Sequence, residues 1–226
     1  MFYNAPLMPA TFESRLNRFL GRVVIDGTTS LVFIPDPGRL EILKPGSRVY
    51  MLKRERLRRK TGFDLVQVDL GHLRVSTDSR IPNKVFEEAL ALNLLPEFKG
   101  FRIVKKEPFF KGSRLDFKLG NHGIIHVEVK SCTLVKDGVG LFPDAPTLRG
   151  NRQLESLVKA LELGRSAIFF LVQREDAGSL KPYTDIDPNF SRALRDASRK
   201  GVEAYAYNAK VTSEGVFINR RIPVSL

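Results

Sequence analysis

The chain has 226 residues, of which 42% are hydrophobic, so it is long enough to bury a core in one domain or two. No apolar run reaches the ~18 residues that a membrane span needs, and the N-terminus lacks a basic segment followed by an apolar one. A single cysteine, Cys132, excludes a framework of internal disulfides and fits a reducing compartment. We therefore expect a cytoplasmic protein without membrane contact, and its formal net charge of +12 favours a polyanionic partner.

Residues 1–80 have the pattern of a small β domain. Extended segments are predicted at 11–19, 22–26, 31–34, 48–53 and 63–70, with turns rich in Gly and Pro among them. Short strands at this spacing are typical of a small Greek-key barrel, so we predict an OB-like barrel for these residues. That scaffold often binds oligonucleotides, although a fold by itself does not assign a function.

A dense basic segment lies in this domain at residues 53–60, between two of the predicted strands. Its lysines and arginines could contact phosphates, or they could only protect the edge of a sheet from aggregation. Because the whole chain is also basic, we predict phosphate contact. The predicted nucleic-acid-binding residues of this segment are Arg54, Arg56, Arg58, Arg59 and Lys60.

From residue 81 the pattern changes to mixed helix and strand, so we place a second domain at residues 81–226. Helices are predicted at 82–93, 147–163 and 188–200, and strands at 101–109, 167–172, 202–207 and 215–222. On the first helix, Glu88 falls within the apolar arc, whereas Glu87 projects from the opposite side. The chain is thus predicted to be α/β (α+β), with a mixed sheet flanked by helices in its second domain.

The most informative part of this domain is a predicted hairpin whose strands carry residues 113–117 and 124–130. Strand side chains alternate between faces, so Asp116, Glu128 and Lys130 can share one polar side. The apolar residues expected on the opposite side are Leu115, Phe117, Val127 and Val129. Two carboxylates and an ammonium would then lie on one wall of the sheet.

The length of the connecting loop predicts the register of this hairpin. A five-residue loop, 120–124, would pair Leu119 with Ile125 and set Asp116 opposite Glu128. Like charges that face each other across a ladder are destabilising, and a divalent cation between them would remove the repulsion. Carboxylate oxygens suit Mg²⁺ or Mn²⁺. A solvated polar face on a surface hairpin would show the same alternation, so the residues alone leave both interpretations open.

The order helix, three strands, helix, strand, with Glu88, then Asp116, then Glu128 and Lys130 two residues apart, resembles the core of the PD-(D/E)xK nucleases. Leu115 stands where that motif has its proline. More closely, the chain resembles the sugar fermentation stimulation protein (SfsA) family over nearly its whole length. The motifs that carry this resemblance lie at 113–117, 128–134 and 142–150, with supporting matches at 36–39, 83, 88–89 and 167–170.

This resemblance implies a DNA-binding protein, associated with the regulation of sugar-utilisation genes, with an OB-like domain followed by a restriction-endonuclease-like domain. It implies a Mg²⁺ or Mn²⁺ site at Asp116, Glu128 and Glu88. Lys130 would orient the attacking water or help to deprotonate it. Arg114 would hold a phosphate or neutralise the carboxylates.

The chain departs from the family at Leu148 and Gln153, where many members have Glu and His. The resemblance therefore gives no support to a chemical role for that helix. A divalent-metal-dependent nuclease acting on DNA is the function that we expect. The alternatives are a DNA-binding regulator that keeps the metal pocket without cleaving, and a nuclease whose substrate is RNA.

Overall fold

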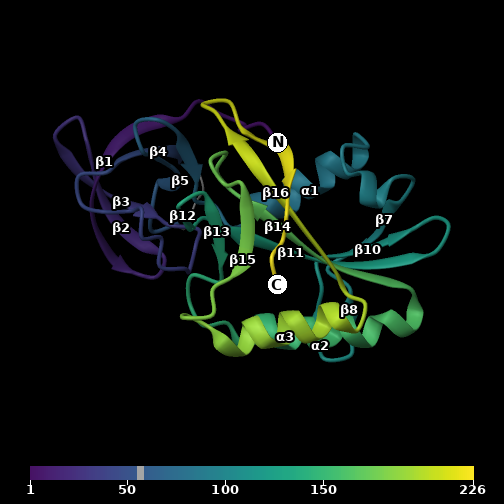
Figure 1. Cartoon of the computed structure of the whole chain (residues 1–226). Coiled ribbons are helices and arrows are strands. Elements are labelled where there is room, and N and C mark those ends of the chain that lie inside the picture. The colour runs from purple at the N-terminus through teal and green to yellow at the C-terminus, as the bar shows by residue number, and fades with distance from the viewer. Residues whose placement is uncertain (55–58) are drawn as a thin grey trace.

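The structure, a computed structural model, describes residues 1–54 and 59–226. A β-barrel lies beside a larger domain in which helices cover both faces of a sheet (Figure 1). The barrel comes from the N-terminal part of the chain and the larger domain from the remainder. Within the described ranges, no helix is both long enough and apolar enough to cross a membrane.

Six strands form the sheet of the barrel. They are β1 (Met8–Asn17), β2 (Leu20–Ile25), β3 (Thr28–Phe33), β4 (Arg48–Lys53), β5 (Phe63–Asp69) and β6 (Arg74–Ser76). Their order is β3-β2-β1-β4-β5-β6, and a further pairing of β3 with β5, at Phe33 and Asp64, closes the barrel. Every second side chain of a strand points into the barrel: Ala10 and Phe12 of β1 are buried, while Thr11 between them is exposed. The predicted small barrel is confirmed.

The larger domain contains a mixed six-stranded sheet with the order β17-β16-β14-β11-β10-β7. Its strands are β7 (Arg102–Lys106), β10 (Phe117–Gly120), β11 (Ile124–Cys132), β14 (Arg165–Val172), β16 (Glu203–Val211) and β17 (Val216–Ile222). The three central strands β11, β14 and β16 are parallel, and β7, β10 and β17 pair antiparallel at the two sides. The predicted α/β class with a mixed sheet is confirmed.

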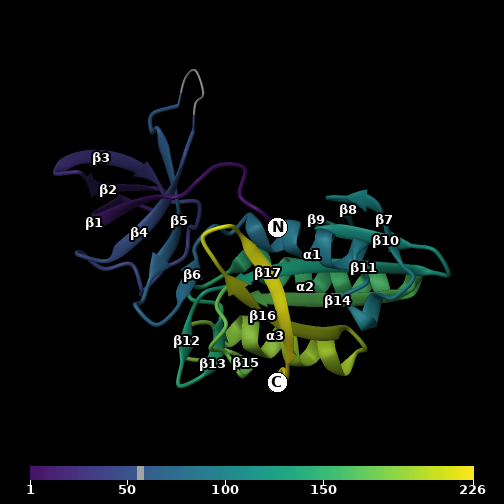
Figure 2. The same cartoon turned by 90° about the horizontal axis from the view of Figure 1, so that it is seen from above.

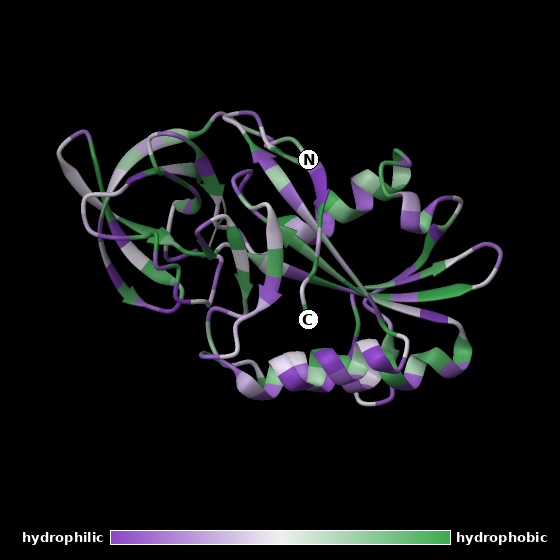
Figure 3. Cartoon of the chain, in the orientation of Figure 1, coloured by the Kyte–Doolittle hydropathy of each residue, from purple (hydrophilic) through white to green (hydrophobic). Residues whose placement is uncertain are grey.

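Three helices cover this sheet. α1 (Ile81–Ala91) lies on one face, and α2 (Leu148–Ala160) and α3 (Pro188–Arg199) lie on the other (Figure 2). Hydrophobic and hydrophilic residues alternate along α2 and α3, as expected of helices with one face on a sheet (Figure 3). Under α1, Phe86 packs against Phe117 and Phe169, with ring centroids 5.2 and 5.0 Å apart.

The remaining elements are short. They are the 3₁₀ turns η1 (Pro96–Phe98) and η2 (Leu161–Leu163), the hairpin β8 (Phe109–Phe110) and β9 (Ser113–Arg114), and a small sheet of β12 (Val135–Lys136), β13 (Val139–Phe142) and β15 (Ser179–Pro182). The strand predicted at 101–109 was too long, because β7 ends at Lys106 and the β8–β9 hairpin follows. That small sheet brings the 142–149 segment towards the barrel.

The prediction that Leu115 and Phe117 share a face is wrong. Residues 115 and 116 lie between β9 and β10, outside any strand. Leu115 is buried with Leu154 and Leu157 of α2, whereas Phe117 belongs to the core beneath α1. Alternation applies only within an uninterrupted strand, so the break at 115–116 reverses the face on which Leu115 lies.

Polar contacts join the two domains. Ser76 at the end of the barrel donates its backbone N–H to the Gln173 carbonyl at 3.0 Å and its hydroxyl to Gln173 Oε1 at 2.7 Å. Asp144 Oδ2 accepts the Arg39 N–H at 3.0 Å. A Cβ at position 38 would clash with the Asp144 carboxylate, so glycine at 38 allows the two loops to meet. These contacts fix a loop of the barrel over the second domain.

A buried carboxylate holds three arginines at the closure of the barrel. Asp64 is only 1% exposed, and its Oδ2 accepts from Arg54 at 3.1 Å and from Arg80 at 3.0 Å. Its Oδ1 accepts from Arg59. Burial by itself would raise the pKa of Asp64, but the hydrogen bonds from Arg80 and Arg59 outweigh it and the pKa is lowered. Asp64 therefore stays ionised, and it binds arginines near both ends of the basic segment.

We expect Asp64→Asn to destabilise the protein by about 3–5 kcal/mol at pH 7, because it leaves three guanidinium groups without their shared anion. The lowered pKa means that this stabilisation is complete above the unfolded pKa of Asp and is lost as the pH falls through the folded value. Urea unfolding at several pH values measures both effects. Asp26→Asn, at an exposed turn of the same barrel, is the control and should leave stability unchanged; an equal loss in both variants would contradict the role given to Asp64.

Candidate active site

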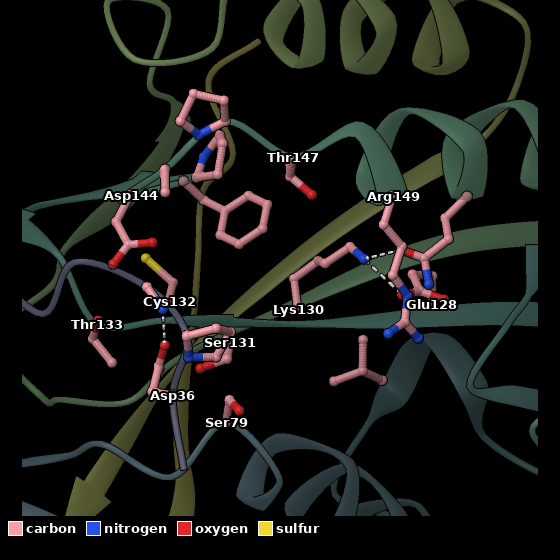
Figure 4. A pocket seen from close by; sticks show the side chains of 18 of the residues that line it. Asp36, Ser79, Glu128, Lys130, Ser131, Cys132, Thr133, Asp144, Thr147 and Arg149 are labelled. Atoms are coloured by element: carbon pink, nitrogen blue, oxygen red, sulfur yellow. Dashed lines mark hydrogen bonds and ion pairs between the residues drawn. The ribbon is translucent and has the colours of Figure 1, made fainter. Parts of the chain in front are cut away.

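A cavity of about 340 Å³ opens between the barrel and the second domain. The second half of β11 forms its floor, the segment that leads from β13 into α2 forms one wall, and the barrel loop at Asp36–Gly38 forms another. Figure 4 shows Glu128, Lys130 and Ser131 side by side along β11, with Asp36 and Asp144 at the far end. The cavity therefore brings together residues from both domains.

The hairpin register places Asp116 beside β11. Leu119 pairs with Ile125, as predicted, although Gly120 and Ile124 are also paired, so the loop is 121–123 and shorter than the predicted 120–124. Asp116 itself lies just before β10, where its Oδ2 accepts the backbone N–H of Val129 at 2.7 Å and its Oδ1 accepts from the Asn83 side chain of α1 at 2.8 Å. Both carboxylate oxygens are thus fixed in direction next to Glu128.

Glu128 carries a buried charge. The residue is 2% exposed, and its Oε1 accepts a hydrogen bond from Lys130 Nζ at 2.6 Å. Its Oε2 is buried and has no hydrogen-bond partner within the described ranges. Burial raises the pKa of Glu128 to about 7, with the Asp116 charge adding to the rise and Lys130 opposing it. A buried oxygen of this kind requires a cation or a proton.

Lys130 is fixed from two sides. Its Nζ donates to Glu128 and also to Gln153 Oε1 of α2 at 2.7 Å. Gln153 Nε2 in turn donates to the Arg114 carbonyl at 3.3 Å. This contact places α2 next to the candidate site, which the sequence did not predict. The signal in the sequence is a polar residue on the face that α2 buries, next to Leu154.

Glu88 does not lie at the site. Its carboxylate binds the amino group of Met1, and it does not line the cavity. Asn83 is the residue of α1 that reaches Asp116. Glu88 is five positions after Asn83, a step that turns the helix by about 140°, so the two side chains face different directions. The expectation that Glu88 is a metal ligand or catalytic residue is therefore not supported by its position.

The described basic residues that were predicted to bind nucleic acid do not line the cavity. Arg114 is exposed, pairs with Glu107 at 3.3 Å and does not line the cavity. Arg54 and Arg59 bind Asp64, and Lys60 is exposed. Arg56 and Arg58 lie outside the described residues. The arginines that line the cavity are Arg18 of the barrel and Arg149 of α2, neither of which we had predicted as site residues.

The donor set fits a hard divalent cation. In residues 1–54 and 59–226, no three His, Cys, Asp or Glu side chains are grouped to hold a metal. At the β11 end of the cavity, Asp116 and Glu128 are the described residues that supply carboxylates, and one or two carboxylates with waters suffice for Mg²⁺. The unpaired Glu128 Oε2 is the observation that favours a cation. These residues could hold one ion, with water completing its coordination.

A second buried acid lies at the barrel end of the cavity. Asp36 is 7% exposed, and its Oδ1 accepts the Gly38 N–H at 2.7 Å. Burial raises the pKa of Asp36 to about 7, helped by the charge of Asp144 and opposed by the Gly38 N–H. Ionisation of Asp36 therefore destabilises the folded state near neutral pH.

Comparison with known proteins places the chain among relatives of one kind. Residues 14–76 match a family described as "SfsA N-terminal OB domain", and residues 80–215 match "Sugar fermentation stimulation protein RE domain". The chain is 42% identical to a "Sugar fermentation stimulation protein homolog" of Caldanaerobacter subterraneus, with 100% of both chains covered. It is 44% identical to the homolog of Moorella thermoacetica, with 98% of each covered. Among solved structures, "The structure of Pyrococcus Furiosus SfsA in complex with Ca2+" is 32% identical, with a TM-score of 0.93 over 100% of this chain and 98% of that one.

We expect Asp36→Asn to stabilise the protein above pH 7, because the amide keeps the bond from Gly38 and removes a buried charge. A folded pKa near 7 against an ordinary value of 3.8 sets an upper bound of roughly 4 kcal/mol. The raised pKa means that the gain is absent below about pH 4, grows between pH 4 and 7 and is constant above. Thermal unfolding across this range, with Asp26→Asn as the exposed control, measures it; a gain that does not depend on pH would contradict the assignment.

Proposed function

The chain belongs to the sugar fermentation stimulation protein family, and from this premise we propose that it binds DNA and cleaves its phosphodiester bonds with one divalent cation. In this proposal residues 1–80 hold the nucleic acid and residues 81–226 cut it. The observation that carries the proposal is the unpaired, buried Glu128 Oε2 beside Asp116, in a cavity between the two domains. The net charge of +12 suits a polyanionic substrate.

Asp116 and Glu128, with the carbonyl of Val129, are the proposed ligands. Asn83 and the Val129 N–H hold the Asp116 carboxylate, so this ligand is oriented before a cation arrives. When bound, Mg²⁺ or Mn²⁺ would stabilise the negative charge that develops on the phosphate during cleavage. The Ca²⁺ in the name of the Pyrococcus furiosus structure supports a divalent ion for this chain as well.

Lys130 is the proposed group that positions the attacking water. Glu128 and the Gln153 amide hold its ammonium in the cavity, and its side chain is only 11% exposed. Two of its three donors are occupied by these contacts, which leaves one for a water in the cavity. Arg149 and Arg18 line the same cavity and would contact the phosphates of the strand. Each residue thus has a role that its contacts allow.

We expect Mn²⁺ to raise the melting temperature of the wild type by about 5–10 °C at a concentration 100-fold above its Kd, because only the folded state binds it. Asp116→Asn and Glu128→Gln should lose this rise, whereas Glu88→Gln should keep it, since Glu88 lies outside the cavity. Differential scanning fluorimetry in EDTA and in Mn²⁺ measures each rise. Equal rises in all four proteins would contradict the site, and loss in Glu88→Gln alone would restore Glu88 as a ligand.

We expect Lys130→Ala to reduce cleavage of DNA by about 10²-fold or more, as for the loss of a positioned proton-transfer group. DNA affinity should stay nearly unchanged, because one lysine contributes little to the phosphate contacts. Lys210→Ala, at an exposed lysine of β16 outside the cavity, is the matched control and should cleave normally. The measurement is the cleavage of labelled DNA and RNA, each single- and double-stranded, in the presence of Mg²⁺, Mn²⁺ or EDTA. DNA binding without cleavage by the wild type would favour the non-catalytic regulator, and cleavage of RNA alone would change the substrate.

A further inference from the structure

Two phenylalanine rings meet on the outside of the barrel. Phe19 lies in the turn between β1 and β2 and is 44% exposed. Its ring stacks on that of Phe33 at the end of β3, with centroids 6.1 Å apart and an angle of 19° between the planes. An aromatic ring exposed to this degree is only partly buried by folding, so packing of the barrel accounts for only part of its surface.

Three arginines surround these rings. The Arg18 guanidinium lies 5.8 Å from the centroid of Phe19, and those of Arg59 and Arg80 lie 5.6 and 5.8 Å from the centroid of Phe33. These distances are within the range of cation–π attraction. We call these five residues, Phe19, Phe33, Arg18, Arg59 and Arg80, the aromatic–arginine platform.

The platform is held rigidly by the closure of the barrel. Phe33 pairs with Asp64 where β3 meets β5, and Asp64 binds Arg59 and Arg80. The buried carboxylate therefore fixes two guanidinium groups against the Phe33 ring before any ligand arrives. Side chains that are already ordered lose less entropy on binding, which favours affinity.

We propose that the aromatic–arginine platform binds an unpaired base of a single-stranded DNA segment by stacking it on Phe19. Every base has a π face, so stacking on an aromatic ring tolerates any sequence, and arginines beside the ring contact the phosphates. In a blunt duplex the bases are paired and stacked on each other, so none is free to stack on Phe19. This inference rests on the proposed binding of DNA, and it specifies a DNA with a single-stranded stretch as the ligand.

The platform adjoins the cavity of the candidate active site. Arg18 belongs to the platform and also lines that cavity with Glu128 and Lys130. Arg80 is the residue before α1, the helix whose Asn83 holds Asp116. A strand with one base on Phe19 therefore has its adjacent backbone near the cavity mouth, so single-stranded DNA next to the cleaved bond is the substrate class that the geometry suits.

The sequence offers an unusually clean test, because the chain contains no tryptophan. Phe19→Trp places a single fluorescent ring on the platform, and Phe109→Trp places one at an aromatic that is 72% exposed on β8, far from the barrel (Figure 2). Each is titrated in EDTA with a 12-nucleotide single strand and with a blunt duplex. We expect the single strand to quench the fluorescence of Phe19→Trp and to leave Phe109→Trp unchanged, while the blunt duplex quenches neither.

Anisotropy of a labelled single strand, also in EDTA, gives the second measurement. Phe19→Ala should weaken binding about five-fold or more, since stacking on one aromatic ring contributes about 1–3 kcal/mol per base. Phe109→Ala should bind as the wild type does. Any of four results would overturn the inference. Two concern the variants: Phe19→Ala binds with wild-type affinity, or Phe19→Trp binds the single strand without quenching. The other two are that the blunt duplex quenches Phe19→Trp equally, or that the wild type does not bind single strands.

These outcomes are separate from the test of cleavage. All binding measurements are made without a divalent cation, so a protein that never cleaves can still show the platform. A protein that cleaves duplex DNA and shows no quenching has the proposed nuclease function without this platform. Failure of the platform and failure of cleavage are therefore distinguishable.

Discussion

Glu128 places a carboxylate in the interior of the second domain, on the central strand β11, and the residues around it compensate that charge only in part. Lys130, which Gln153 holds in place, donates to Glu128 Oε1, while Glu128 Oε2 keeps no partner among the described residues. Burial without full compensation raises the pKa of Glu128 to about 7. A group held in this condition binds a cation or a proton strongly, which is the property that a hydrolytic metal site needs.

A second buried carboxylate organises the barrel by the opposite arrangement. Asp64 is fully compensated by three arginines, and its pKa is lowered. The same contacts hold Arg59 and Arg80 against the Phe33 ring on the outer surface. Glu128, whose charge is only partly compensated, thus lies in the cavity, whereas Asp64, whose charge is compensated, holds the arginines of the outer surface in place. Compensation, more than burial, separates a reactive group from a structural one.

The two domains depend on each other for the candidate site. The barrel supplies Asp36, Gly38 and Arg18 to the cavity, and the second domain supplies the carboxylates and the lysine. Asp144 holds the barrel loop over this cavity through the Arg39 N–H. The position of the barrel and the shape of the cavity are therefore coupled through a short loop contact, because the barrel cannot shift without moving one wall of the cavity.

Local structure could be predicted from the sequence: the alternation of the barrel strands, the approximate ends of the helices, and the pairing of Leu119 with Ile125 that sets Asp116 beside β11. These features follow from turn length and periodicity, which act between near neighbours. Packing of α1 against the rest of the domain, in contrast, turns Asn83 to the site and Glu88 to the Met1 amino group, and the sequence did not predict this. Periodicity gives the apolar arc of a helix, but packing sets which way that arc faces. The pairing of β4 with β5 likewise brings Arg54 and Arg59 to Asp64, because the burial of that acid depends on how the barrel closes and cannot be read from the basic segment.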